Sequence, residues 1–353
     1  MLHSPQIIVN SRFLTQKISG VQRFAIEISC ELKKLYGDNV SFISPKGIVQ
    51  KEVAAELGVE TFGKYSGYFW EQFELPSYLK SKGSPLLLNL GNTAPVFYAN
   101  NIVTLHDVTF ERFPGQMPLK FRIMYQFLIP KIVKRARQLV TVSEFSRQEI
   151  ADVYSLNKES ISIVHNAVSG EFSYKPVEKK ERYILAVASI SYQKNIPALI
   201  KAFNLLAAED VSLYLVGNAN KNFTDKQLLS EIERNNDIVF LGRVDDSKLV
   251  ELYSNAECFV FPSLYEGFGI PPLEAQACQC PVVVSNAASL PEVCLDSVVY
   301  CDPLNISDIG EKINSVLVND DLKASLKFKG VENIKRFNWQ KSAQQMKEII
   351  DKL

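Results

Sequence analysis

The sequence has few of the residues that disulfide frameworks and metal sites require. Its 353 residues include three histidines and six cysteines, and only Cys278-x-Cys280 is a closely spaced cysteine pair. So few cysteines in so long a chain exclude a fold held by disulfides, and so few imidazoles disfavour a structural metal site. An Asp-x-Asp metal motif is also absent, so we expect chemistry that works without a bound metal.

The chain also lacks an excess of charge and a long apolar run. Lys and Arg total 39 and Asp and Glu total 39, so no global field would attract nucleic acid. No stretch approaches roughly 18 consecutive apolar residues, and the N-terminus has neither a basic region nor the apolar core of a signal peptide. We therefore expect a cytoplasmic protein that neither is secreted nor spans a membrane.

Short β-branched runs alternate with segments of helical period almost from end to end, which is typical of repeated β-α units around parallel sheets. The length corresponds to about two domains of ~150 residues. A polar, charged segment at 169–182 resembles a surface linker. We predict α/β domains at 1–172 and 173–335, both doubly wound, and a C-terminal helix at 336–353 that packs on either domain, the first by preference.

The segment 259–285 contains the loop with the most candidate ligand-binding residues. A buried strand leads to Glu266, Gly267 and Gly269, and Pro271 then opens a helix that holds Glu274. The glycines let the backbone approach a ligand closely, so that N–H groups and the helix start can face a diphosphate. Glu274 can accept two hydrogen bonds from a vicinal diol such as a ribose. The alternative is that Glu274 only caps the helix dipole.

Four further residues follow predicted strands or precede helices. Lys194 lies just ahead of a helix opened by Pro197, where it can neutralise a phosphate or simply remain an exposed lysine. His106 and Asp107 end an apolar strand, at a place where a histidine is either structural or catalytic. Gly20 precedes a helix and suits either a close backbone approach or a plain helix start. No G-x-G-x-x-G follows the first strand, which disfavours an NAD-dependent dehydrogenase.

These residues fall into a familiar order. The E-x7-E block EGFGIPPLE resembles the signature of the family 4 retaining glycosyltransferases, which have the GT-B fold of two Rossmann-like domains facing a central cleft. SGVQRF, VTLHDVTFERFP, LVTVSEFSRQEI, VHNAV, SYQKN, VFLGRV and SLPEV match in order, so that the resemblance covers almost the whole chain. The HD and SEFSR blocks look most like mannosyltransferases that build bacterial surface polysaccharides such as O-antigen and capsule.

The resemblance implies a role for each matching position. Glu274 would bind the ribose, Lys194 the phosphates, and Glu266 a hydroxyl of the donor sugar. His106 would lie beside the transferred sugar, and Ser143 and Glu144 would line the cleft. The remaining donor contacts would come from Gly20, Val21, Val244, Gly267, Phe268, Gly269 and Ile270. Many family members carry an arginine where this chain has Ser189, so Lys194 would bear more of the leaving-group charge, with Arg243 as a possible compensating cation.

The expected reaction is transfer of a hexose with retention of configuration. Retention through a covalent intermediate would need two adjacent carboxylates. A same-face transfer, in which the departing diphosphate helps deprotonate the acceptor, suits Glu266 better as a sugar ligand. By resemblance the preferred donor is GDP-mannose, a co-substrate with no separate cofactor, and the acceptor is a glycan or an undecaprenyl-diphosphate-linked oligosaccharide. Rhamnose, glucose or galactose donors, a catalytically silent binding subunit and a sugar-nucleotide epimerase are the alternatives.

One basic segment is not explained by these roles. Residues 118–138 combine large apolar side chains with six cations: Lys120, Arg122, Lys131, Lys134, Arg135 and Arg137. Such a segment either lies on an anionic bilayer or is an ordinary helix with a solvated charged face, and Pro130 interrupts its pattern. A peripheral contact with the inner face of the plasma membrane is therefore a second expectation for localisation.

Overall fold

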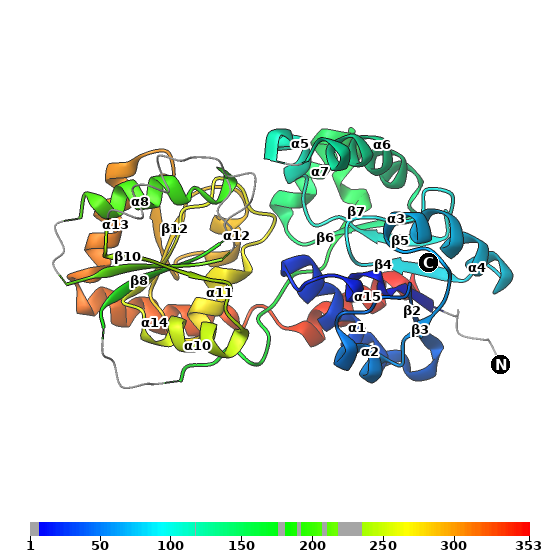
Figure 1. Ribbon diagram of the computed structural model, residues 1–353, viewed down its shortest axis with the longest axis horizontal. Coiled ribbons are helices and arrows are strands. Elements are labelled where there is room, and N and C mark those ends of the chain that lie inside the picture. Colours follow the sequence, from blue (N-terminus) through cyan, green and yellow to red (C-terminus); the bar gives the residue numbers. More distant parts are fainter. Residues whose placement is uncertain (1–6, 117, 176–180, 189–191, 207–209, 218–234) are drawn as a thin grey trace. The chain divides into compact units, whose positions relative to one another are not determined.

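The computed structural model describes residues 7–116, 118–175, 181–188, 192–206, 210–217 and 235–353 (Figure 1). The chain divides into two compact units, of which unit 1 is Met1–Asn166 with Trp339–Leu353 and unit 2 is Ala167–Asn338. The division at residue 166 lies a few residues before the boundary expected at 172. Each unit is built around one parallel sheet with helices on both of its faces.

The sheet of unit 1 has seven parallel strands in the order β3-β2-β1-β4-β5-β6-β7. The strands are β1 (Ile7–Asn10), β2 (Val40–Ser44), β3 (Glu60–Thr61), β4 (Leu86–Asn89), β5 (Asn101–Thr104), β6 (Gln138–Thr141) and β7 (Ile161–Ile163). The central strands are buried along their whole length, as parallel strands covered on both faces must be. Their order reverses between β1 and β4, and open α/β sheets generally bind ligands at the ends of the strands where such a reversal occurs.

The helices of unit 1 cover the sheet with apolar faces. They are α1 (Gly20–Tyr36), α2 (Lys51–Leu57), α3 (Gly67–Phe69), the π-helical turn η3 (Trp70–Glu74), α4 (Leu75–Ser81), α5 (Thr109–Arg112), α6 (Leu119–Arg135), α7 (Glu144–Tyr154) and α15 (Trp339–Asp351), with short 3-10 turns at η1 (Ser11–Thr15), η2 (Gly37–Asn39), η4 (Pro114–Gln116) and η5 (Lys158–Ser160). Trp70 and Leu79 pack on β1, β2 and β4, while Ile129 and Val133 pack near β5 and β6. Pro130 lies inside α6 without ending it.

The C-terminal helix α15 belongs to unit 1. It lies on α1, where the ring of Trp339 meets the ring of Phe24 edge-on at a centroid distance of 6.1 Å. At the other end of α1 the hydroxyl of Tyr36 donates to Asp351 at 2.7 Å. Trp339, Met346 and Ile350 are buried at helical spacing, so that α15 contributes a full apolar face to the unit 1 core.

Unit 2 repeats the architecture with six parallel strands in the order β10-β9-β8-β11-β12-β13. The strands are β8 (Tyr183–Val187), β9 (Ser212–Val216), β10 (Ile238–Gly242), β11 (Cys258–Phe261), β12 (Val282–Ser285) and β13 (Val299–Cys301). The helices are α8 (Ile196–Asn204), α10 (Asp246–Asn255), α11 (Ile270–Ala277), α12 (Leu290–Cys294), α13 (Ile306–Leu317) and α14 (Asp320–Ile334), and η6 (Tyr192–Lys194) precedes α8. The strand order reverses between β8 and β11. The prediction of two doubly wound α/β units is therefore confirmed.

Candidate functional site

The reversal of strand order in unit 2 brings two predicted site residues into contact. Lys194 ends the turn after β8, and Glu266 lies in the loop after β11. Their side chains form an ion pair with Nζ and Oε1 2.5 Å apart, and they are 22% and 12% exposed. The ammonium group also lies 5.2 Å from the centroid of the Phe261 ring. A positive charge is thus fixed at the carboxyl ends of the two central strands, where open α/β sheets bind ligands.

Hydrogen bonds from three residues hold the two loops in place. The backbone N–H of Leu264 donates to the carbonyl of Gln193 at 2.7 Å, which ties the loops to each other. Asn195 adopts the left-handed conformation, with φ 55°, and its amide donates to the carbonyls of Pro262 and Pro303. Ser289 donates to the carbonyls of Glu266 and Phe268 at 3.0 and 2.9 Å. The loop that carries Glu266 is therefore preorganised from both sides.

Gly269 fixes the point at which the loop becomes helix α11. It is the N-cap of the helix with φ 95°, a backbone conformation that side chains disfavour. A Cβ built on Gly269 would lie 2.6 Å from Cδ2 of Leu290, so the position also lacks room for a side chain. Pro271 and Pro272 then fill the first turn, as the sequence predicts. The glycine is required by both the conformation and the packing of this turn.

Glu274 lies in α11, half-buried, and its Oε2 accepts a hydrogen bond from the hydroxyl of Tyr253 at 3.3 Å. Tyr253 is fully buried, and its pKa is raised by burial first and by the neighbouring carboxylate second. The phenol therefore stays protonated and donates to Glu274, which orients the carboxylate.

Val244 and Arg243 follow a strand that is not one of the two at the reversal, β8 and β11. Val244 is half-buried and Arg243 is exposed in the turn after β10, an edge strand that β9 separates from β8. The sheet order therefore does not make Arg243 a neighbour of Lys194. Ser189 lies outside the described residues.

His106 is buried at the end of β5 in unit 1. Its Nε2 lies 3.0 Å from the carbonyl oxygen of Leu90, so Nε2 must carry the hydrogen of this bond. The imidazole meets the ring of Phe24 edge-on at 4.9 Å, and the backbone N–H of His106 donates to Asn92. Burial lowers the pKa of His106. The side chain is accordingly a neutral imidazole in a fixed orientation at neutral pH.

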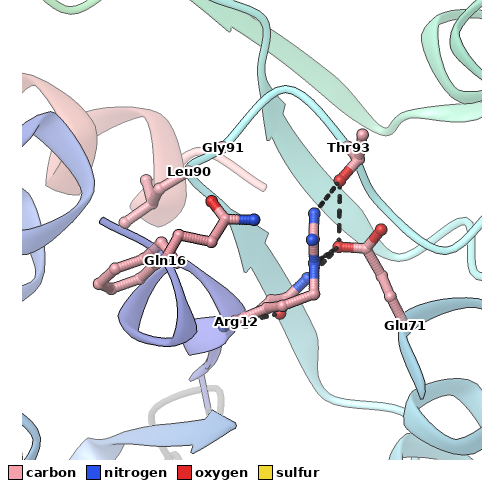
Figure 2. Close-up of a pocket in the computed structure, with 8 residues that line it drawn as sticks. Arg12, Gln16, Glu71, Leu90, Gly91 and Thr93 are labelled. Atoms are coloured by element: carbon pink, nitrogen blue, oxygen red, sulfur yellow. Dashed lines mark hydrogen bonds and ion pairs between the residues drawn. The ribbon is translucent and has the colours of Figure 1, made fainter. Parts of the chain in front are cut away.

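A pocket lies at the reversal of strand order in unit 1, and Figure 2 shows its lining. Arg12, which follows β1, pairs with the buried carboxylate of Glu71 at 3.0 Å and donates to Thr93 at 2.7 Å. Burial and the charge of Glu71 act in opposite directions on the pKa of Arg12, which is raised overall. The lining residues are Asn10, Arg12, Phe13, Gln16, Glu71, Leu90, Gly91 and Thr93.

The same pocket lies next to two residues singled out in the sequence. A Cβ on Gly91 would lie 3.8 Å from Cγ1 of Val21, and the carbonyl of Leu90 holds His106. Gln16 accepts a hydrogen bond from Gln22 of α1 at 2.6 Å. The start of α1, His106 and the polar pocket thus form one continuous region, with polar groups that suit the hydroxyls of a saccharide.

Ser143 and Glu144 are at the start of α7. The Ser143 hydroxyl accepts from the N–H of Ser146 at 3.0 Å and caps the helix, and Glu144 pairs with Arg147 at 2.5 Å. These contacts give both residues a structural role, and their predicted place along a cleft stays a prediction.

Within the part of the chain that the structure describes, no three His, Cys, Asp or Glu side chains gather as a potential metal site. Among the same residues, no helix combines the length and apolar character needed to cross a membrane.

Comparison with known families identifies the class of protein. Residues 18–172 match the family described as Glycosyltransferase Family 4, and residues 171–332 match Glycosyl transferases group 1. The chain belongs to the family 4 glycosyltransferases, which are retaining enzymes that depend on nucleotide sugars.

The chain resembles particular bacterial members of this family. It is 32% identical to O-antigen chain mannosyltransferase B of Escherichia coli over 255 residues, or 68% of this chain and 67% of that protein. It is 31% identical to O-antigen chain mannosyltransferase RfbU of Salmonella typhimurium, covering 64% of this chain and 63% of that protein. A serotype-specific mannosyltransferase of Escherichia coli, WbdA, aligns at 30% identity over only 30% of its length.

Solved structures confirm the GT-B fold. HepE of Anabaena, in complex with UDP and glucose, superposes with a TM-score of 0.80 at 18% identity, covering 99% of this chain and all of that one. WaaG, a glycosyltransferase involved in lipopolysaccharide biosynthesis, superposes with a TM-score of 0.71 at 14% identity, covering 98% and 99% of the two chains.

Proposed function

We propose that unit 2 binds the donor nucleotide sugar at the ends of β8 and β11. The observation that supports this proposal is the contact between Lys194 and Glu266, because a cation suited to a diphosphate and a carboxylate suited to a sugar hydroxyl then lie side by side. In this arrangement the diphosphate replaces Glu266 as the partner of Lys194. Glu266 then accepts a hydrogen bond from a hydroxyl of the sugar, and Glu274 accepts two from the ribose.

The proposed chemistry depends on charge that develops as the glycosidic bond breaks. The departing diphosphate gains negative charge, so Lys194 interacts more strongly with the transition state than with the bound donor. The ion pair holds the ammonium group in position before the donor binds. Transfer on the same face of the sugar, with the diphosphate accepting the acceptor proton, requires no carboxylate nucleophile and no metal.

Unit 1 contributes the acceptor side in this proposal. His106 is a neutral imidazole, and its Nε2–H donates to the Leu90 carbonyl. In this proposal the ring lies in a fixed orientation beside the transferred sugar and contributes no charge. Gly20 and Val21 provide backbone at the start of α1. The polar pocket around Arg12 and Gln16 adds hydroxyl-binding groups next to them.

The sugar and the acceptor are proposed from the relatives. Two relatives at about 30% identity are named as O-antigen chain mannosyltransferases, which favours mannose from GDP-mannose and an acceptor glycan or lipid-linked oligosaccharide of a cell-surface polysaccharide. The crystal structure of HepE contains UDP and glucose, so glucose from a UDP donor is the second candidate.

A thermal-shift screen tests the donor. A ligand that binds only the native state raises the melting temperature by mass action. GDP and GDP-mannose are expected to raise it more than UDP, dTDP and their sugars at equal concentration, with AMP as the control. A larger shift with UDP-glucose would replace the mannosyl assignment, and the absence of any shift with every nucleotide would contradict a donor site in unit 2.

A further inference from the structure

An exposed surface of unit 1 combines large apolar side chains with cations, and we call it the aromatic-basic surface. Its apolar members are exposed by 46% to 73%, and they belong to three segments around α3, the loop after β4 and helix α6. They are Tyr65, Phe69, Phe73, Phe97, Leu119, Phe121, Ile123 and Phe127. The exposed cations on α6 are Lys120, Lys131, Lys134 and Arg135.

Contacts between the three segments hold them next to one another. The hydroxyls of Tyr68 and Tyr125 lie 3.3 Å apart, and the Tyr68 ring meets Phe121 edge-on, so the segment around α3 lies against α6. Gln72 donates to the carbonyl of Ala94 and accepts from the N–H of Val96, which joins η3 to the loop after β4. The exposed side chains therefore belong to one region of unit 1.

The loop after β4 is also joined to α6. The guanidinium group of Arg135 lies 5.4 Å from the centroid of the Phe97 ring and donates to the Val96 carbonyl. Phe97 is 73% exposed, so this cation covers only part of the ring. The third segment is thereby held beside the C-terminal half of α6.

The outer face of α6 is neither an ordinary solvated face nor a core face. Lys120, Ile123, Phe127, Lys131 and Lys134 recur at helical spacing and are all exposed, whereas Ile129, Ile132 and Val133 are buried on the other side. Between residues 112 and 143 the sequence contains no Asp or Glu at all. A solvated helix usually carries charges of both signs, and here acids are replaced by large apolar residues.

We propose that the aromatic-basic surface docks on an anionic phospholipid bilayer. A bilayer presents a negative surface to the cations and an apolar interior to the rings, and both match a face with cations and no carboxylate on α6. Glu74, which ends η3 beside this surface, is half-buried and accepts hydrogen bonds from the N–H groups of Lys64 and Tyr65, which offset its charge. Aromatic rings and long cationic side chains are suited to the membrane interface.

The docking is distinct from donor binding, because it uses residues outside the proposed donor site. One consequence of docking rests on the proposed function. A glycosyltransferase held at the bilayer meets a lipid-linked acceptor without diffusing through solution.

Liposome flotation of the full chain tests the proposal. Vesicles rich in phosphatidylglycerol are expected to carry the protein to the top of the gradient at low salt, and phosphatidylcholine vesicles are not. Each cation near an anionic surface contributes about fivefold to affinity. Lys131→Ser with Lys134→Ser is therefore expected to weaken binding roughly tenfold to thirtyfold, and Phe69→Ser with Phe73→Ser should weaken it as well.

Matched variants separate docking from general effects. Lys46→Ser with Lys51→Ser and Leu35→Ser with Val49→Ser remove exposed lysines and exposed apolar residues elsewhere in unit 1. Both controls should float like the wild type, and all variants should keep their thermal shift with the donor. The proposal is overturned if the wild type does not float, if surface and control variants float equally, or if neutral and anionic vesicles bind equally. Reversible dimerisation abolished by the same surface variants, without flotation, would assign the surface to a second copy of the chain.

Discussion

Replacing Lys194 with alanine is expected to lower turnover by roughly two orders of magnitude. One donor aimed at developing negative charge contributes about 3 kcal/mol to transition-state stabilisation, and Lys194 is the cation that the structure fixes at the ends of β8 and β11. Because Lys194 is partly exposed and lies in a loop, the substitution should leave the fold intact. The measurement is the rate of nucleoside diphosphate release at saturating donor, compared with Lys201→Ala, which removes an exposed lysine of α8.

A second variant distinguishes two reasons for such a loss. Lys194→Ala also leaves Glu266 without its cation, and this negative charge would repel the diphosphate. In Lys194→Ala with Glu266→Gln the repulsion is gone. If Lys194 acts on the leaving group, the double variant stays slow. Wild-type turnover in Lys194→Ala, or recovery in the double variant, would contradict the proposed role of the lysine.

Replacing Glu274 is expected to weaken donor binding by roughly tenfold to a hundredfold. A charged acceptor contributes about 1.5 to 3 kcal/mol for a hydrogen bond, and ~1.4 kcal/mol corresponds to tenfold in affinity. Glu274→Gln suits the test better than alanine, since the amide oxygen still accepts from the buried hydroxyl of Tyr253. Because the proposed contact is with the ribose, calorimetry should show similar losses for the nucleoside diphosphate and for the sugar nucleotide.

The control for this prediction uses the other carboxylates of unit 2. Glu266→Gln should weaken binding of the sugar nucleotide while changing the affinity for the nucleoside diphosphate little. Glu311→Gln, which alters an exposed carboxylate of α13, should change neither affinity. If Glu274→Gln binds both ligands with wild-type affinity, the proposed ribose contact is contradicted.

The geometry of the loop around Glu266 was largely predictable, because the residues that determine it lie in one short segment. The strand, the glycines and the prolines around Glu266 are consecutive in the chain, and each has a local physical meaning. The contact between Lys194 and Glu266 joins residues 72 positions apart. The two residues meet because β8 and β11 are neighbouring strands, and the local sequence around either residue does not predict this pairing.

The polar pocket of unit 1 was missed for a related reason. The partner of Arg12 is Glu71, which lies 59 positions away in a helical segment with no motif around it. The only sequence signal was the polar run Asn10, Ser11 and Arg12, which begins at the last residue of the otherwise apolar strand β1. Buried pairs between distant elements depend on sheet order and helix placement, so local spacing cannot identify them. Arg243, named as a compensating cation for Ser189, follows the edge strand β10, and its role stays a prediction.

The most direct test of the central claim is the configuration of the first product. The protein is incubated with a saccharide acceptor and with the donor that gives the largest thermal shift, and the first product is followed by NMR. The configuration is read from the one-bond coupling between C1 and H1 of the transferred sugar before any equilibration. The transferred sugar is expected to keep the configuration it has in the donor, and Lys194→Ala is expected to slow its appearance. An inverted product, or no sugar transfer and no nucleoside diphosphate release from any donor, would contradict the account.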